Sequence, residues 1–313
     1  MNSALSPTTI KILIPCHCCG PYIEQCLHSL QNQAFSNWQA LITDDASNDD
    51  TVSRIQPFMT DRRFRFISHA ERRYLMQNIL GGLHELAPEP NEVVAILDGD
   101  DFLLPGALEK IWQAHQQGYD LVYSDDDRGE RGFSIGRQII ASVPIRQQLW
   151  SFSQLRTFKG YLLAGLEEYH LQDQNGQFFR AAGDLSLFFP LAERVGTQKI
   201  MFIPEQLYVY RIHDNCNHYV RRAEQLANNW QIRARPPLPL QTDFFDFTEE
   251  FPGLEKPMLR HLEKQIRDKY PSPYSVCIVN PIRQALVDSW RSYNNLWLGE
   301  GIFLKARITD QNE

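Results

Sequence analysis

The chain has 313 residues, and its 31 Lys and Arg against 38 Asp and Glu give a formal net charge of −7. An acidic chain lacks the basic surface that binds nucleic-acid phosphates, so we expect no nucleic-acid partner. The sequence has no apolar run of the roughly 18 residues that a membrane-spanning helix needs, and its N-terminus has no secretory signal pattern. Four of the six cysteines fall within eleven positions, which is not the pattern of a disulfide framework. We therefore expect a cytoplasmic protein without a transmembrane segment, and peripheral contact with the cytosolic face of a membrane stays open.

Strand-like and helix-like segments alternate through the first half of the chain. Short apolar runs predict strands, whereas apolar residues at three- and four-residue spacing predict helices. Strands are expected at residues 10–15, 39–43, 64–67, 93–97 and 120–123. Helices are expected at residues 21–30, 52–55 and 74–86 and from residue 105 onward. The alternation predicts an α/β fold with a Rossmann-like, mostly parallel sheet flanked by helices, and functional residues at the carboxyl ends of the strands.

The second half is less regular and ends in a change of composition. Two further strand-like runs occupy residues 199–203 and 207–210, and the proline-rich residues 235–239 indicate a boundary. We expect a domain at residues 1–235, with halves at about 8–127 and 128–235. Residues 236–313 would form a C-terminal appendage of helices and loops. Its Leu286, Trp290, Tyr293 and Trp297 have helical spacing, which is typical of a packing face; an oligomer contact or a membrane contact stays open.

Acidic residues follow several of the predicted strands. The Asp-Gly-Asp-Asp sequence at residues 98–101 follows the fourth strand, and three aspartates at residues 125–127 follow the fifth. Carboxylates this close repel one another unless a cation or a donor network holds them, and Mg²⁺ or Mn²⁺ prefers oxygen ligands. The pattern indicates a metal–phosphate site. A solvated turn and an aspartyl-phosphate hydrolase are the weaker alternatives.

A second acidic cluster follows the second predicted strand. Asp44 and Asp45 open a turn rich in Ser, Asn and Asp, and a carboxylate there can accept the N3–H of a uracil or cap the next helix. Arg72 and Arg73 form a nearby basic spot that can contact a nucleotide or can be ordinary surface charge.

Four sequence blocks resemble the family 2 glycosyltransferases, which have the GT-A fold. Residues 12–51 are similar to the opening of that family and residues 97–106 to its D-x-D block. Residues 183–196 are similar to the segment that carries the catalytic base, and residues 203–213 to the closing strand and histidine. The blocks occur in the family's order and together cover about residues 10–215.

The resemblance implies a role for each matching residue. Asp184 would be the general base, and Asp100 and His213 would hold Mg²⁺ or Mn²⁺. The nucleotide-sugar site would be formed by Pro15, His17, Asp44, Asp45, Arg72, Arg73, Asp98 and Gly99. The family pattern has Glu-Asp where this chain has Gly183 followed by Asp184, which leaves a helix N-cap as the alternative role of Asp184.

The implied function is metal-dependent, inverting transfer of a hexose-type sugar from a nucleotide-sugar, expected to be a UDP-sugar. The acceptor would be a glycan, lipid-linked or protein-linked hydroxyl in surface polysaccharide or glycan biosynthesis, and a homo-oligomer stays open. The alternative is a non-catalytic relative that binds nucleotide-sugar or glycan. Residues 148–159 and 176–180 mix aromatic residues with Arg and Lys, and they can form an acceptor or donor-sugar surface or ordinary packing. Lys159 and Arg180 can alternatively meet the phosphate of a lipid-linked acceptor. Zinc at residues 16–19 is a weaker alternative, because adjacent residues of an extended chain point to opposite faces and only Cys16 and Cys19 have the spacing of a zinc site.

Overall fold

The computed structural model describes residues 9–213, 221–238, 243–247, 277–279 and 302–306. The chain divides into two compact units, one of Met1–Ala192 with Thr197–Pro237 and one of Glu193–Gly196 with Leu238–Glu313. The predicted division at residue 235, and the two halves within the first domain, stay predictions. No helix among the described residues has the length and hydrophobicity to cross a membrane.

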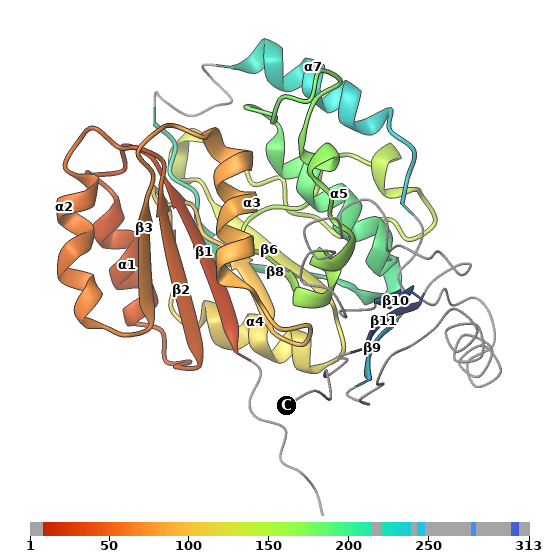
Figure 1. Ribbon diagram of the computed structural model, residues 1–313, viewed down its shortest axis with the longest axis horizontal. Coiled ribbons are helices and arrows are strands. Elements are labelled where there is room, and N and C mark those ends of the chain that lie inside the picture. The colour runs from red at the N-terminus through yellow and green to blue at the C-terminus, as the bar shows by residue number, and fades with distance from the viewer. Residues whose placement is uncertain (1–8, 214–220, 239–242, 248–276, 280–301, 307–313) are drawn as a thin grey trace, which may run out of the picture. The chain divides into compact units, whose positions relative to one another are not determined.

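The first unit alternates strands and helices, as the sequence predicts (Figure 1). Its strands are β1 (Ile10–Cys16), β2 (Trp38–Asp44), β3 (Phe64–Ser68), β4 (Val93–Ile96), β5 (Phe102–Leu103), β6 (Leu121–Asp127), β7 (Arg156–Lys159) and β8 (Ile200–Val209). Its α-helices are α1 (Ile23–Gln31), α2 (Thr51–Ile55), α3 (Tyr74–Leu86), α4 (Ala107–Gln116), α5 (Gly183–Val195) and α7 (Arg222–Arg233).

The eight strands form one sheet in the order β3-β2-β1-β4-β7-β6-β8-β5. The pairs β3–β2, β2–β1, β1–β4 and β6–β8 are parallel, whereas β4–β7, β7–β6 and β8–β5 are antiparallel. The predicted α/β fold is confirmed. The strands β3, β2, β1 and β4 pair in parallel, whereas β7, in the middle of the sheet, runs antiparallel to both of its neighbours.

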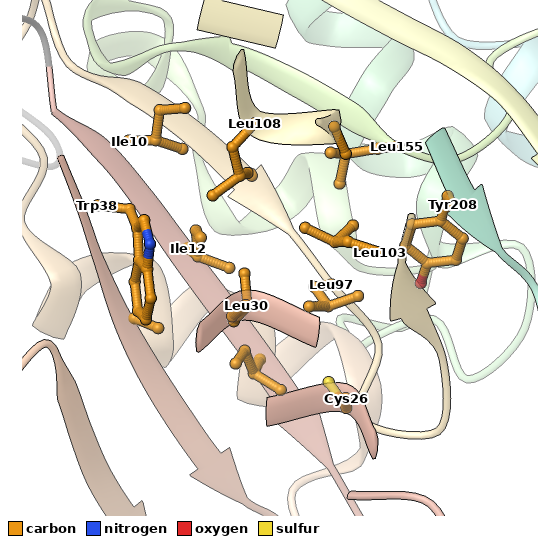
Figure 2. Close-up of a cluster of buried hydrophobic side chains, with 14 of the residues drawn as sticks. Ile10, Ile12, Cys26, Leu30, Trp38, Leu97, Leu103, Leu108, Leu155 and Tyr208 are labelled. Atoms are coloured by element: carbon orange, nitrogen blue, oxygen red, sulfur yellow. The ribbon is translucent and has the colours of Figure 1, made fainter. Parts of the chain in front are cut away.

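Helices cover both faces of the sheet because side chains alternate along each strand. Ile10, Ile12 and Ile14 of β1 point to one face and pack with α1 and α4 in a core cluster (Figure 2). Leu13 points to the other face, where α3 packs. This contact requires a glycine in α3, since a Cβ at Gly82 would lie 2.4 Å from a methyl of Leu13.

Two details of the second half differ from the sequence prediction. The aspartates at residues 125–127 lie within β6, not after it, because β6 continues beside β8 through register shifts at Ser124–Asp126. The two predicted runs at 199–203 and 207–210 form the single strand β8. Pro204, which has no N–H to donate, falls where the register with β6 shifts.

In the second unit, the residues described beyond Leu238 form a three-stranded parallel sheet in the order β10-β11-β9. These strands are β9 (Asp243–Phe247), β10 (Cys277–Val279) and β11 (Ile302–Ala306), where the sequence suggested helices and loops. The predicted helical face of Leu286, Trp290, Tyr293 and Trp297 lies outside the described residues.

Candidate functional site

The carboxyl ends of the parallel strands meet at one edge of the sheet. Cys16, Asp44 and Ser68 end their strands at matching register, and the β4 strand pairs beside β1. The residues that follow these strands therefore lie at one edge, as expected for a doubly wound sheet.

Asp45 follows β2, and the structure uses both of its carboxylate oxygens within the protein. The buried side chain accepts the N–H of Arg73 at 2.6 Å and the N–H of Tyr74 at 2.8 Å. The first N–H groups of a helix have no partner within the helix, and a carboxylate at that end also complements the helix dipole. Asp45 thus anchors the start of α3. Each oxygen retains a second lone pair toward other donors.

Asp44 is fully buried and braces the turn after β2. Its Oδ2 accepts the N–H of Ser47 at 3.2 Å and the hydroxyl of Ser68 at 3.0 Å, and its Oδ1 lies 3.9 Å from Cys16 Sγ. These contacts tie the ends of β1, β2 and β3 together. Of the two aspartates, Asp45 is the one beside the basic residues.

The first turn of the site is held tightly against β1. Gly99 donates its N–H to the Pro15 carbonyl oxygen at 3.1 Å, and a Cβ at Gly99 would lie 2.7 Å from Cys16 Cβ. His17 Nδ1 lies 2.8 Å from the carbonyl oxygen of Asp45. Pro15, His17 and Gly99 therefore meet where β1 and β4 end, and only glycine permits this approach.

Two arginines flank one tyrosine beside Asp45. The guanidinium carbons of Arg72 and Arg180 lie 4.9 Å and 3.8 Å from the Tyr74 ring centroid. The Arg72 Nε is 3.9 Å from Asp45 Oδ2, whereas Arg73 lies near Gly81 of α3. The structure thus places Arg180 and Arg72 at the same tyrosine ring, although the two residues are far apart in the sequence.

The Asp98–Asp101 turn is fixed from the far side of the sheet by β8. The buried Asp101 accepts the hydroxyl of Tyr208 and the N–H of Arg211, both at 2.7 Å, and the Asp98 N–H donates to the Tyr208 oxygen at 3.2 Å. Burial and then the charges of Asp100 and Asp98 raise the pKa of Asp101. Asp101 therefore has a structural partner for each oxygen.

Asp98 lies among charged neighbours. Burial raises its pKa to about 7, Asp100 and Asp184 raise it as well, and Arg156 lowers it. Its Oδ2 accepts an N–H of Gln154 at 3.2 Å. These interactions show that residues from β4, β7 and α5 converge at Asp98.

Asp100 and His213 form a pair of partly exposed polar side chains. His213 Nε2 lies 3.0 Å from Asp100 Oδ2, and the two side chains are 22% and 32% exposed. The His213 ring stacks on Tyr22 with centroids 5.4 Å apart. Among the described residues, no group of three or more His, Cys, Asp and Glu side chains could hold a metal ion. The zinc alternative at Cys16 and Cys19 therefore has no support in this part of the chain, and both thiols are buried.

Asp184 lies in the first turn of α5 and faces the guanidinium group of Arg156. Its Oδ2 is 3.0 Å from Arg156 Nη1, its Oδ1 accepts the N–H of Leu185 at 3.0 Å, and the side chain is 35% exposed. The residue lies inside the helix and not before it. Its carboxylate is therefore accessible at the site, although it also stabilises the helix start.

The sequence places Gln154 and Arg156 in a candidate sugar-binding segment and Tyr208 in the closing strand, but it does not connect any of the three with the carboxylates of the site. Arg156 reaches it because β7 is antiparallel to β4 and pairs Arg156 with Ile96, the last residue of β4. The same register pairs Lys159 with Val93, the first residue of β4, so the structure separates Lys159 from the site. No spacing in the sequence reveals the direction of β7.

Comparison with known proteins agrees with this geometry. A family model described as glycosyl transferase family 2 matches residues 11–180. Glycosyltransferase GlyG of Streptococcus pneumoniae is 24% identical over 221 residues, which cover 64% of this chain and 70% of GlyG. The GalNAc(5)-diNAcBac-PP-undecaprenol beta-1,3-glucosyltransferase of Campylobacter jejuni is 30% identical over 118 residues, which span 37% of each chain.

Solved structures share the fold at low sequence identity. Residues 1–349 of S. aureus TarS, in complex with UDP-GlcNAc, are 14% identical with a TM-score of 0.51, over 67% of this chain and 60% of that TarS chain. The mannosyltransferase PcManGT of Pyrobaculum calidifontis, in complex with GDP-Man and Mn²⁺, is 18% identical with a TM-score of 0.54, over 75% and 68%. The fold is that of GT-A glycosyltransferases, and because the family model spans more than half of the sequence, this chain is an enzyme of glycosyl transferase family 2.

Proposed function

We propose that this enzyme transfers a hexose-type sugar, with inversion, from a UDP-sugar to an acceptor hydroxyl. One observation carries the proposal: the Asp100–His213 pair and the Asp184–Arg156 pair converge on Asp98 at the carboxyl edge of the sheet. The first pair suits the diphosphate of a donor, and the second provides a carboxylate for the acceptor.

A divalent cation fits the chemistry of the Asp100–His213 pair. One carboxylate oxygen and one imidazole nitrogen are donors that Mn²⁺ accepts, and Mg²⁺ characteristically uses one or two carboxylates together with phosphates and water. Asp100 and His213 would hold the cation, and the donor diphosphate would complete its coordination. When bound, the cation neutralises the charge that develops on the leaving diphosphate.

The nucleotide would lie along the ends of β1 and β2. Asp45 can accept the uracil N3–H through a free lone pair, and Arg72 is half-exposed and beside it. This wall is shaped by the backbone contact of Pro15 with Gly99 and by the side-chain contacts of His17 and Asp44, while Arg73 supports α3. Asp98 would face the ribose or the cation.

Asp184 would act as the general base. The acceptor oxygen forms a bond to the anomeric carbon, the bond from that carbon to the UDP oxygen breaks, and the hydroxyl proton moves to an oxygen of Asp184. The electron pair of the broken bond leaves with UDP. A single displacement of this kind inverts the anomeric centre.

The acceptor class and the setting are extensions of the same proposal. The Campylobacter relative acts on an undecaprenol-linked substrate and another relative is a chondroitin synthase, which supports a glycan or lipid-linked acceptor in surface glycan assembly. A protein-linked acceptor is the other candidate. We place the enzyme in the cytoplasm, with peripheral access to a membrane-borne acceptor.

A donor panel tests the proposal. The full chain is incubated with UDP-glucose, UDP-galactose, UDP-GlcNAc, UDP-GalNAc and GDP-mannose, each with Mn²⁺, Mg²⁺ or EDTA, and release of nucleoside diphosphate is measured. We expect metal-dependent release from a UDP-sugar. Binding of UDP without release from any donor would support the non-catalytic relative, and release from GDP-mannose alone would replace the uridine donor.

A further inference from the structure

A chain of polar contacts connects the donor-side and acceptor-side carboxylates. Arg156 Nη1 lies 3.0 Å from Asp184 Oδ2, and Arg156 Nε donates to Gln154 Oε1 at 3.2 Å. The other end of Gln154 donates from Nε2 to Asp98 Oδ2 at 3.2 Å. The four side chains thus form one connected series, Asp98–Gln154–Arg156–Asp184, which joins β4 to α5 through β7.

The charges at the two ends fix the orientation of the Gln154 amide. Its NH₂ group faces a carboxylate, and its oxygen faces a guanidinium N–H. The flipped amide would place oxygen against oxygen and N–H against N–H, so both hydrogen bonds would be lost. Gln154 is also buried, with 3% of its surface exposed, which restricts other conformations.

Arg156 is held at its position from several sides. It pairs with Ile96 of β4 and Tyr123 of β6 in the middle of the sheet. Its guanidinium carbon lies 5.2 Å from the Phe188 ring centroid and 5.9 Å from that of Trp150, and its side chain is 11% exposed. The planar guanidinium can serve two partners at once through Nε and Nη1, which a lysine ammonium at the end of a flexible stem cannot do in the same geometry.

Asp184 needs such a partner more than the other carboxylates of the site. The side chain is 35% exposed, and besides facing Arg156 it accepts the N–H of the adjacent Leu185. Asp98 lies close enough to Asp184 for the two carboxylates to repel each other, and repulsion favours an Asp184 rotamer that points to solvent. A misplacement of about 1 Å in a reacting group can lower a rate by about 10²-fold.

We infer that Arg156 is a positioning residue for the transfer reaction: it holds the Asp184 carboxylate and, through Gln154, sets the position of that carboxylate relative to Asp98. The inference rests on the proposed role of Asp184 as general base. Arg156 donates to Asp184 and Gln154 and its side chain is 11% exposed, so we expect its effect on kcat and not on donor affinity.

The test compares Arg156→Met with a matched control, Arg63→Met. Arg63 also pairs with a carboxylate, Asp61 at 2.7 Å, and also lies over an aromatic ring, Trp38 at 4.0 Å. It precedes β3, at the amino edge of the parallel strands and therefore opposite the site. The readouts are kcat and donor KM for UDP release, with the panel donor that is turned over fastest and Mn²⁺, together with the UDP affinity from calorimetry and the thermal unfolding midpoint.

We expect Arg156→Met to lower kcat by about 10- to 100-fold, with donor KM and UDP affinity changed by less than about 3-fold. Arg63→Met should leave kcat unchanged. Arg156→Lys should restore part of kcat, because its ammonium can reach Asp184 but not Gln154 as well. Gln154→Leu keeps the ion pair and loses its tie to Asp98, so a smaller fall of about 3- to 10-fold is expected. A kcat of Arg156→Met equal to that of the control overturns the inference.

A double-mutant cycle on kcat separates positioning of the base from a general structural role. If Arg156 acts through Asp184, the double variant Asp184→Asn/Arg156→Met has the kcat of Asp184→Asn alone, within about 2-fold. Losses that multiply overturn the inference and leave the proposed function standing. Normal turnover by Asp184→Asn overturns both, because the base then lies elsewhere. Should Arg156→Met fail to fold, Arg156→Lys and Gln154→Leu give the same cycle.

Discussion

The site contains two sets of carboxylates that differ in burial and in the groups they contact. Asp44 and Asp45, at the end of β2, are buried and accept hydrogen bonds from backbone N–H groups. Asp100 and Asp184, after β4 and in α5, are about one-third exposed and face the cationic or titratable side chains of His213 and Arg156. The same residue type therefore occurs in two electrostatic settings at one edge of the sheet.

The difference suggests that the first set of carboxylates stabilises the fold and that the second set is available for binding and proton transfer. A carboxylate that satisfies backbone N–H groups is part of the fold, because its loss leaves buried donors without partners. A partly exposed carboxylate facing a side chain can exchange that partner for a ligand or a proton at little cost to the fold. The variants below test this division, beginning with the largest expected effect.

Asp184→Asn should lower transfer by at least ~10²-fold, because an amide cannot accept the acceptor proton. UDP affinity and the unfolding free energy should stay close to those of the unmodified protein. Asn keeps one oxygen, for either Arg156 or Leu185, and the donor left over can turn to water because the side chain of residue 184 is 35% exposed. Initial rates of UDP release, calorimetry and denaturant unfolding measure the three quantities. Loss of the fold would place Asp184 with the structural carboxylates.

Asp45→Asn, in contrast to Asp184→Asn, should lower the stability of the fold. One of the two α3 N–H groups would then face an NH₂ group, and the free energy of unfolding should fall by about 1–3 kcal/mol. Asp50→Asn is the control, because Asp50 pairs with Arg54 on an exposed surface where such pairs contribute little. Urea unfolding monitored by circular dichroism would measure both, and equal stabilities would contradict the structural role of Asp45.

Asp100→Ala should weaken UDP binding at least ~10-fold in Mn²⁺, since even outer-shell partners of a metal affect its affinity that much. In EDTA the variant and the unmodified protein should bind UDP equally. Paired titrations with and without Mn²⁺ would test the assignment. A loss of equal size in both conditions would indicate that Asp100 supports the turn rather than a cation.

His115 affects stability only under acidic conditions and defines the pH range for these comparisons. Burial and then the charge of Lys159 lower its pKa to about 3, and its ring nitrogens contact the Tyr119 carbonyl oxygen at 2.8 Å and the Thr157 hydroxyl at 2.9 Å. Above pH 6.5 both the folded and the unfolded states hold neutral His115, so no stability is lost. Below it the unfolded state binds the proton first.

The unfolding free energy should therefore fall as pH drops from 6.5 toward 3, by up to ~1.4 kcal/mol per pH unit from this group. His115→Gln should reduce that slope when the two proteins are unfolded in urea at a series of pH values. Parallel slopes would show that His115 is protonated in the folded protein.

Local sequence pattern was sufficient to predict the elements that short-range residue spacing determines. The helix predicted at residues 74–86 is α3 to the residue, and the acidic residues after the second and fourth predicted strands lie at the sheet edge. The limit was tertiary pairing. Strand β6 runs through its three aspartates because β8 accompanies it, and β8 passes through Pro204 at a register shift. Neither event has a signal within a short window of sequence.

The site shows the same limit at particular residues. The aspartates could be found because they follow strands, and their roles stay predictions. Gln154 and Arg156 lie in a segment that the sequence marks only as a candidate sugar-binding surface. Their place beside Asp98 and Asp184 depends on a strand that runs against its neighbours, which the sequence does not reveal. Arg180 reaches Tyr74 across more than a hundred residues, and sequence spacing cannot predict such a contact.

Strand β7 has only four residues, and its two faces have unlike duties. Arg156 points to the face that carries Asp184 of α5, while Thr157 points to the opposite face and contacts His115 of α4. A slip of one residue in this strand would exchange the two, presenting a hydroxyl to the carboxylates and a guanidinium to the core. The register of this short strand therefore decides which side chain faces Asp184. An insertion or deletion before Arg156 that shifts this register would be expected to abolish transfer even where every site residue is retained.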